Sequence, residues 1–202
     1  RPQLLTEMAQ DFQADIILLG PNQAAPKGRF FPGSTADTLL HYSPQSLGLI
    51  PRKAKLSKHG VTRFNFVITE RGDRADRELL GAAALADRWD LPLRILAFSA
   101  NELLNSPSKD KSDIALKLTA EWHEDSLAML DRARDHIQDF FPELEVSSEI
   151  GSGAGWSGAV DSLKWKKGDL MLMASAPQGP IARVFFCLLY TSDAADEGLG
   201  AD

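Results

Sequence analysis

One segment of the chain occurs twice, and this repeat constrains the fold more than any other feature of the sequence. Residues 14–32 match residues 168–186 without a gap, at a constant offset of 154. An Asp, a Leu, a Pro, an Arg and a Phe are identical in the two copies, and the neighbouring apolar positions are similar. An ungapped match at one domain length is better explained by duplication than by chance. We therefore expect two related units, with the second copy interrupted after Phe186.

Short apolar segments alternate with amphipathic ones along the chain, a pattern typical of α/β proteins. The expected strands are 15–20, 46–50, 64–69, 93–98, 143–150 and 169–173, and the expected helices are 34–41, 75–89, 112–141 and 156–165. A polar loop is expected over 101–110, a glycine-rich turn after Ile150, and a capping box from Ser34 to Asp37. The pattern predicts a doubly wound, mostly parallel sheet covered on both faces, with its strand-end loops along one edge.

The repeat also sets the expected domain boundaries. Residues 1–52 correspond to the last third of a first unit, and the basic, small-residue stretch 53–62 is the expected linker. Residues 63–186 then form a second unit that lacks its last strand. From Cys187 onward the chain reads like a translated sequencing adapter, so we expect residues 187–202 to be an artefactual tail.

Composition and charge exclude several classes of function. The net charge is −6 and the isoelectric point is about 5.2, so nucleic acid and anionic membranes are not expected partners. The given sequence has no run of about 18 apolar residues and no visible secretory signal, so we expect neither a membrane span nor secretion. The single cysteine, Cys187, excludes an internal disulfide and cysteine-based metal sites. These features favour a cytoplasmic protein.

The loop after the first strand carries the clearest chemical signal. Gly20 and the pair Gly33-Ser34 are separated by 12 residues, and a helix is expected to begin at Ser34. Glycine lets backbone amides approach an anion closely, and the amino end of a helix favours negative charge. Gly20, Gly33 and Ser34 are therefore the candidate ligand contacts, with a phosphate as the expected group. The alternative is that the two glycines only shape the turn and that Ser34 only caps its helix.

This loop resembles that of the universal stress protein family, whose nucleotide-binding members carry Gly-x2-Gly-x9-Gly-Ser/Thr at this place. The resemblance extends over nearly the whole chain up to Phe186, including the turn 41–44 and the final strand, and it is to the tandem, two-domain, actinobacterial-like type. It implies a Rossmann-like, adenine-nucleotide α-hydrolase-like fold. It also implies ATP, or another adenine nucleotide, as ligand at Gly20, Gly33 and Ser34. Expected partners are other universal stress protein domains, by pairing within the chain or as a homodimer.

The sequence departs from the family pattern at defined positions. Gln23 replaces the second glycine. In the second copy Thr69-Glu70 stands where the family commonly has an Asp, and Pro177 stands in place of a glycine. These departures keep a second function open, an interaction module that binds no nucleotide. A further alternative is a regulatory domain of a larger transporter.

No catalytic apparatus is recognisable, so we expect a protein that is not an enzyme. An enzyme of the wider α-hydrolase-like group shares the fold but needs substrate-activating residues, and none is apparent. His123 and His136 lie 13 residues apart on one expected helix, too far to share a turn. The glycines from Gly151 to Gly158 lack the Lys-Ser/Thr of a P-loop. No Ser-His-Asp or Cys-His arrangement and no set of metal ligands is expected.

Overall fold

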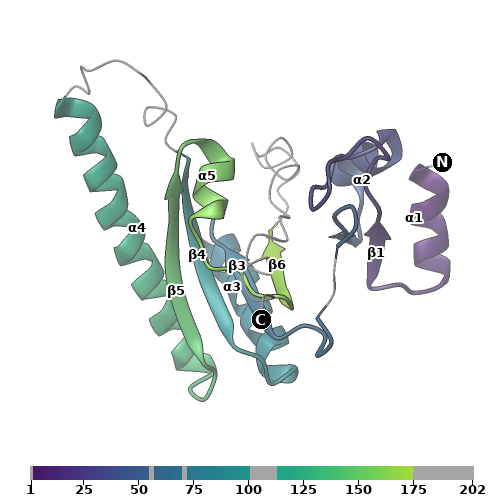
Figure 1. Ribbon diagram of the computed structural model, residues 1–202. Helices are drawn as coiled ribbons and strands as arrows, with labels where there is room; N and C mark the ends of the chain where they lie inside the picture. Colours follow the sequence, from purple (N-terminus) through teal and green to yellow (C-terminus); the bar gives the residue numbers. More distant parts are fainter. Residues whose placement is uncertain (1, 55–56, 70–71, 101–112, 175–202) are drawn as a thin grey trace, which may run out of the picture. The chain divides into compact units, whose positions relative to one another are not determined.

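The computed structural model describes residues 2–54, 57–69, 72–100 and 113–174 (Figure 1). The chain divides into two compact units, and their described parts lie before residue 55 and after residue 56. The polar loop 101–110, Glu70, the second copy of the repeat beyond Ala174 and the tail 187–202 lie outside the described residues.

The first unit contains two helices and a pair of parallel strands. Its elements are α1 (Pro2–Asp11), β1 (Ile16–Leu19), α2 (Ser34–Tyr42) and β2 (Ser46–Leu49). Ile16 pairs with Ser46 and Leu19 with Leu49, so the two strands run in register over their whole length.

Only one face of this strand pair is covered by the described residues. Leu19 packs with Phe30 of the following loop and with Leu39 of α2. On the opposite face Ile16 is 48% exposed and Leu18 is 63% exposed. The sequence predicted a buried strand here; the strand is present, but its apolar residues face α2 on one side only.

The second unit is a four-stranded parallel sheet. Its elements are β3 (Arg63–Val67), α3 (Asp73–Arg88), β4 (Leu93–Ala100), α4 (Asp113–Phe140), β5 (Val146–Gly153), α5 (Gly155–Asp161) and β6 (Asp169–Met173). The strand order is β5-β4-β3-β6, and every pair is parallel. The chain thus adds strands on one side of β3 and then returns to its other side, which is the topology of a doubly wound sheet.

Helices cover both faces of this sheet (Figure 1). On one face, Phe64 and Ile95 pack with Leu79 of α3 and with Leu130 and Ile137 of α4. On the other face, Val67 and Leu96 pack with Leu163, which follows α5. The α/β class, the parallel strands and the two helical layers predicted from the sequence are confirmed, whereas the tandem duplication stays a prediction.

One local expectation about the second unit is wrong. The glycine-rich turn begins later than expected, because Gly151 and Gly153 continue β5 and pair with Phe98 and Ala100 of β4. Glycine is needed at Gly153, where an added Cβ would lie 2.3 Å from the Gly158 carbonyl carbon of α5. The short helix α5 therefore lies directly against the backbone of β5.

A buried polar network spans the α5 face of the sheet. Arg94 of β4 is 3% exposed and donates from Nε to Asn65 Oδ1 at 2.7 Å and from Nη1 to Glu149 Oε2 at 2.8 Å. Its guanidinium lies 5.0 Å from the centre of the Trp165 ring. Burial lowers the pKa of Arg94, and the neighbouring Arg63 acts in the same direction. Arg63 in turn donates to both carboxylate oxygens of Asp169, at 2.8 and 2.6 Å.

We predict that Arg94 and Asn65 act as a unit in stability. Arg94→Met leaves the fully buried Asn65 without its donor, so it should lower the free energy of unfolding by about 2–4 kcal/mol. Adding Asn65→Leu removes the stranded polar group and should recover about 1 kcal/mol or more. Urea unfolding of the two single variants and the double variant measures this coupling. Strictly additive effects would contradict it.

A pair of glycine variants tests the close approach of α5 to β5. Gly153→Ala should lower the free energy of unfolding by about 1–3 kcal/mol, because its Cβ meets the α5 backbone. Gly81→Ala in α3 is the matched control: its Cβ has no neighbour within 4 Å, so it should stabilise by about 0.5–1 kcal/mol. Thermal unfolding of both variants gives the two signs, and a neutral Gly153→Ala would refute the contact.

Candidate functional site

The segment between β1 and α2 contains all three residues predicted to contact a ligand. β1 and β2 are parallel, so both end at the same edge of their sheet, where Gly20 follows Leu19. Gly33 is the N-cap residue of α2, and Ser34 is its first helical residue. In doubly wound folds the carboxyl edge of parallel strands is the usual place of a ligand.

The loop from Gly20 to Gly33 is held by its own side chains and by the chain after β2. Phe30 and Ala25 are 1% and 0% exposed, so both residues fix the loop through buried side chains, and Phe30 packs with Leu19 and Leu39. The Asn22 N–H donates to the Phe31 carbonyl at 2.7 Å, and Asn22 Oδ1 accepts from the Ala24 N–H at 2.9 Å. These bonds close the loop into two turns.

Arg52 fastens the middle of the loop. Its Nη1 donates to the Ala25 carbonyl at 2.9 Å, and its backbone N–H donates to the Arg29 carbonyl at 3.0 Å. The Arg52 carbonyl accepts from the Gly28 N–H at 2.8 Å. Gly28 has a φ of 73°, a left-handed conformation that glycine adopts without strain. Neither Arg52 nor Phe30 was predicted from the sequence as part of the site. The available signal was an aromatic residue within a Pro/Gly-rich loop.

The two candidate glycines are not required by the described fold. An added Cβ at Gly20 or Gly33 meets no atom within 4 Å. Gly33 has φ −83° and ψ 173°, an extended conformation open to any residue. The turn-shaping alternative therefore fails for Gly33, and at Gly20 the described neighbours leave a side chain ample room.

The amino end of α2 has no side chain capping it. The expected capping box from Ser34 to Asp37 is wrong, because the helix begins at Ser34 and Gly33 occupies the N-cap position. A hydroxyl at the first helical residue is one position too late to cap. The Gly33 carbonyl accepts from the Asp37 N–H at 2.9 Å, so the N–H groups of the three preceding residues have no partner within the helix. Unpaired amides at a helix amino end favour an anion.

The other candidate residues considered in the sequence belong to the second unit. His123 and His136 lie on α4 of the second unit, and Gly151 and Gly153 lie in β5. Within the described ranges, no three or more His, Cys, Asp or Glu side chains are grouped so as to hold a metal ion. The helices that the structure describes include none with the length and hydropathy needed to cross a membrane.

Sequence comparison then relates the chain to known proteins. It is 25% identical over 181 residues to universal stress proteins of Mycobacterium tuberculosis and Mycobacterium bovis, a match that covers 90% of this chain. The chain is thus similar in sequence to universal stress proteins over most of its length. It spans 61% of the length of these curated relatives. No model of a protein family matches the sequence.

Two solved universal stress proteins of Archaeoglobus fulgidus are also similar to this chain. One has a TM-score of 0.46 at 15% identity and covers 79% of this chain and 50% of its own. The other has a TM-score of 0.33 at 16% identity and covers 50% of this chain and 66% of its own.

A variant of Arg52 in this chain tests whether the residue holds the loop in place. Arg52→Ala removes the bond to the Ala25 carbonyl, so the amides of Asn22 and Ala25 should exchange with deuterium about tenfold faster or more. Lys53→Asn is the control. It removes the adjacent positive charge at a residue whose φ of 56° Asn tolerates. Equal exchange in Arg52→Ala and the parent chain would argue against the clamp.

Proposed function

We propose that this chain belongs to a cytoplasmic stress-response module that binds an adenine nucleotide, with ATP as the test ligand, through Gly20, Gly33 and Ser34. The proposal rests on one observation above all: Gly33 is a glycine that the described fold does not need, at the uncapped amino end of α2. A ligand that approaches the Gly33 backbone closely would explain why this position holds a glycine. The phosphate groups would then accept hydrogen bonds from the amides of the first helical turn.

The role of the nucleotide in this proposal is regulatory rather than catalytic. The loop is fixed at Phe30 and through Arg52, while Gly20 and Ser34 are exposed. A nucleotide that orders the two ends of the loop would favour one arrangement of the protein over others. We extend the proposal to pairing with other universal stress protein domains, within one chain or as a homodimer.

The alternative function is an interaction module that binds no nucleotide. Gln23 favours it, because this residue replaces a glycine of the family motif and is exposed in the loop. A universal stress protein relative of this kind would use its surfaces for protein partners only. Calorimetry with ATP separates the two functions.

We predict that Gly33→Asn weakens ATP binding without loss of stability. Asn is among the best N-cap residues, and its Cβ meets no atom within 4 Å, so thermal unfolding should occur at the same temperature or higher. A side chain at this position blocks the close approach of a phosphate, and affinity in isothermal titration calorimetry should fall about tenfold or more.

Gly33→Asp is the charged counterpart of this variant. It has nearly the same shape and caps equally well, but it places a negative charge beside the phosphate site, so ATP affinity should fall below that of Gly33→Asn. Lys53→Asn again serves as the control outside the motif. Absence of binding heat at millimolar ATP in the parent chain, or unchanged affinity in both variants, would favour the interaction module.

A further inference from the structure

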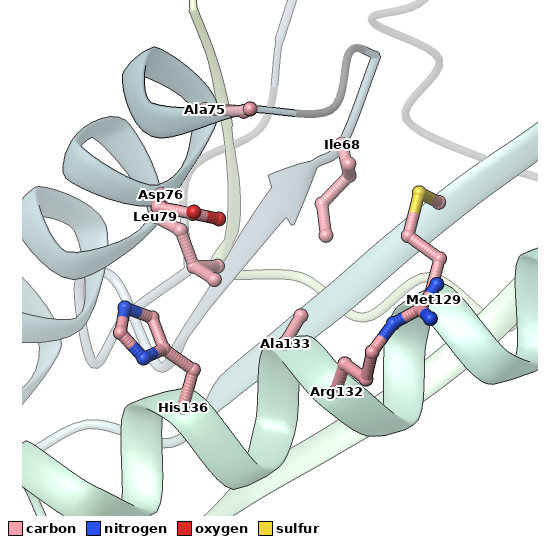
Figure 2. Close-up of a pocket in the computed structure, with 9 residues that line it drawn as sticks. Ile68, Ala75, Asp76, Leu79, Met129, Arg132, Ala133 and His136 are labelled. Atoms are coloured by element: carbon pink, nitrogen blue, oxygen red, sulfur yellow. The ribbon is translucent and has the colours of Figure 1, made fainter.

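A pocket of about 390 Å³ lies between α3 and α4 of the second unit, beyond the carboxyl end of β3 (Figure 2). It is separate from the proposed nucleotide site, whose residues all belong to the first unit. Both helices and the connection between β3 and α3 contribute to its walls: Ile68, Gly72, Ala75, Asp76, Leu79, Met129, Arg132, Ala133 and His136. A volume of this size lies within the usual range of roughly 300–1,000 Å³ for small-molecule sites.

Most of the lining is apolar and suits an apolar ligand body. Ile68 and Met129 are half-buried, and Leu79 and Ala133 are 3% and 8% exposed. Leu79 comes from α3 and Met129 and Ala133 come from α4, whereas Ile68 is the first residue after β3. Two packed helices therefore supply most of the apolar wall, and the start of the β3–α3 connection supplies the rest. Methionine adapts its shape to different ligands.

The polar side chains of the pocket lack hydrogen-bond and ion-pair partners in the described part of the chain, and the His136 ring lies edge-on to Phe140 with 5.4 Å between ring centres. Arg132 and His136 lie one turn apart on α4, and Asp76 lies in the first turn of α3. The side chains of these three residues make no hydrogen bond or ion pair within the described ranges. Arg134, two residues further along α4, instead pairs with Asp131 at 3.2 Å.

Figure 2 shows how these groups are distributed around the pocket. The guanidinium of Arg132 lies on the side of Met129, whereas Asp76 and His136 lie on the other side. A ligand can therefore place one anionic group at Arg132 while its apolar body faces Ile68 and Leu79. One guanidinium and one carboxylate in the same pocket do not compensate several negative charges, which disfavours a polyphosphate.

We propose that this pocket binds a small monocarboxylate with an apolar body. The carboxylate accepts hydrogen bonds from Arg132, whose planar guanidinium matches two carboxylate oxygens. The hydrocarbon part lies against Ile68, Leu79, Met129 and Ala133. The inference goes beyond the proposed nucleotide function and does not depend on it.

Octanoate is the probe for this site, and the methionine methyl groups are the reporters. The chain has four methionines. Met129 lines the pocket, Met171 and Met173 pack on the opposite face of the sheet, and Met8 lies in α1. In spectra of the full chain with ¹³C-methyl methionine, octanoate should shift the Met129 signal saturably and leave the other three in place.

Variants and a neutral probe test the role of the charge. Arg132→Gln should weaken octanoate binding about tenfold or more, whereas Arg134→Gln, outside the pocket on the same helix, should bind as the parent does. Octanol, which has the same chain without the charge, should bind the parent at least about tenfold more weakly than octanoate.

Several results would overturn the proposal. These are no saturable shift of Met129, equal shifts of Met171 and Met173, equal affinity for octanol and octanoate, or an unchanged affinity in Arg132→Gln. Competition between ATP and octanoate at Met129 would also overturn it, because the pocket would then belong to a nucleotide site. Failure of ATP to bind the first unit would leave the octanoate result standing, so the two proposals fail separately.

Discussion

The second unit depends on a cation held inside its sheet. Arg94 is 3% exposed, and it can stay there only because β3, β5 and the chain before β6 bring oxygen atoms and an aromatic ring to it. An isolated charge in this position would cost several kcal/mol, which is comparable with the whole stability of a small domain. The network therefore helps to fix the register of β4, since a shift of this strand by one residue would turn Arg94 toward the apolar face that packs against α3 and α4. Its Nη2 atom is buried without a hydrogen bond among the described groups and relies on Asp169 at 3.8 Å.

The first unit is organised around a loop rather than around a sheet. Phe30 fills the space beneath α2, and Arg52 binds the loop from the chain that follows β2. Both residues fix the middle of the loop and leave its two ends, at Gly20 and Gly33, without steric demands of their own. A loop that is fixed in its middle and unconstrained at its two ends suits a segment whose ends contact a ligand.

Periodicity predicted the described strands and every described helix except α1, because apolar spacing reflects the faces that these elements bury. The helix Pro2–Asp11 was missed. The strand at Phe64 and the long helix ending at Phe140 follow from local patterns alone. The end of β5 did not follow, because glycines read as a turn unless the packing of α5 against Gly153 is known.

The candidate site was predictable only in part. Gly20, Gly33 and Ser34 could be found from their spacing, since a motif is local. The clamp by Arg52 joins residues 27 positions apart, and the Arg94 network joins four strands, so neither can be recognised without the tertiary structure. The α3–α4 pocket could not be predicted either. Nothing in the local sequence around His136 indicates that it lines the same pocket as Asp76, which lies on a different helix.

The exposed face of β1 affects how the protein behaves in solution. Leu18 and Ile16 expose apolar surface to water. The hydrophobic attraction between such surfaces on different molecules is weaker in the cold than at room temperature. Low concentration and low temperature should therefore keep the protein from self-associating, whereas high concentration in a warm buffer should promote aggregation. The solubility of this chain is then expected to depend on two aliphatic side chains of a four-residue strand.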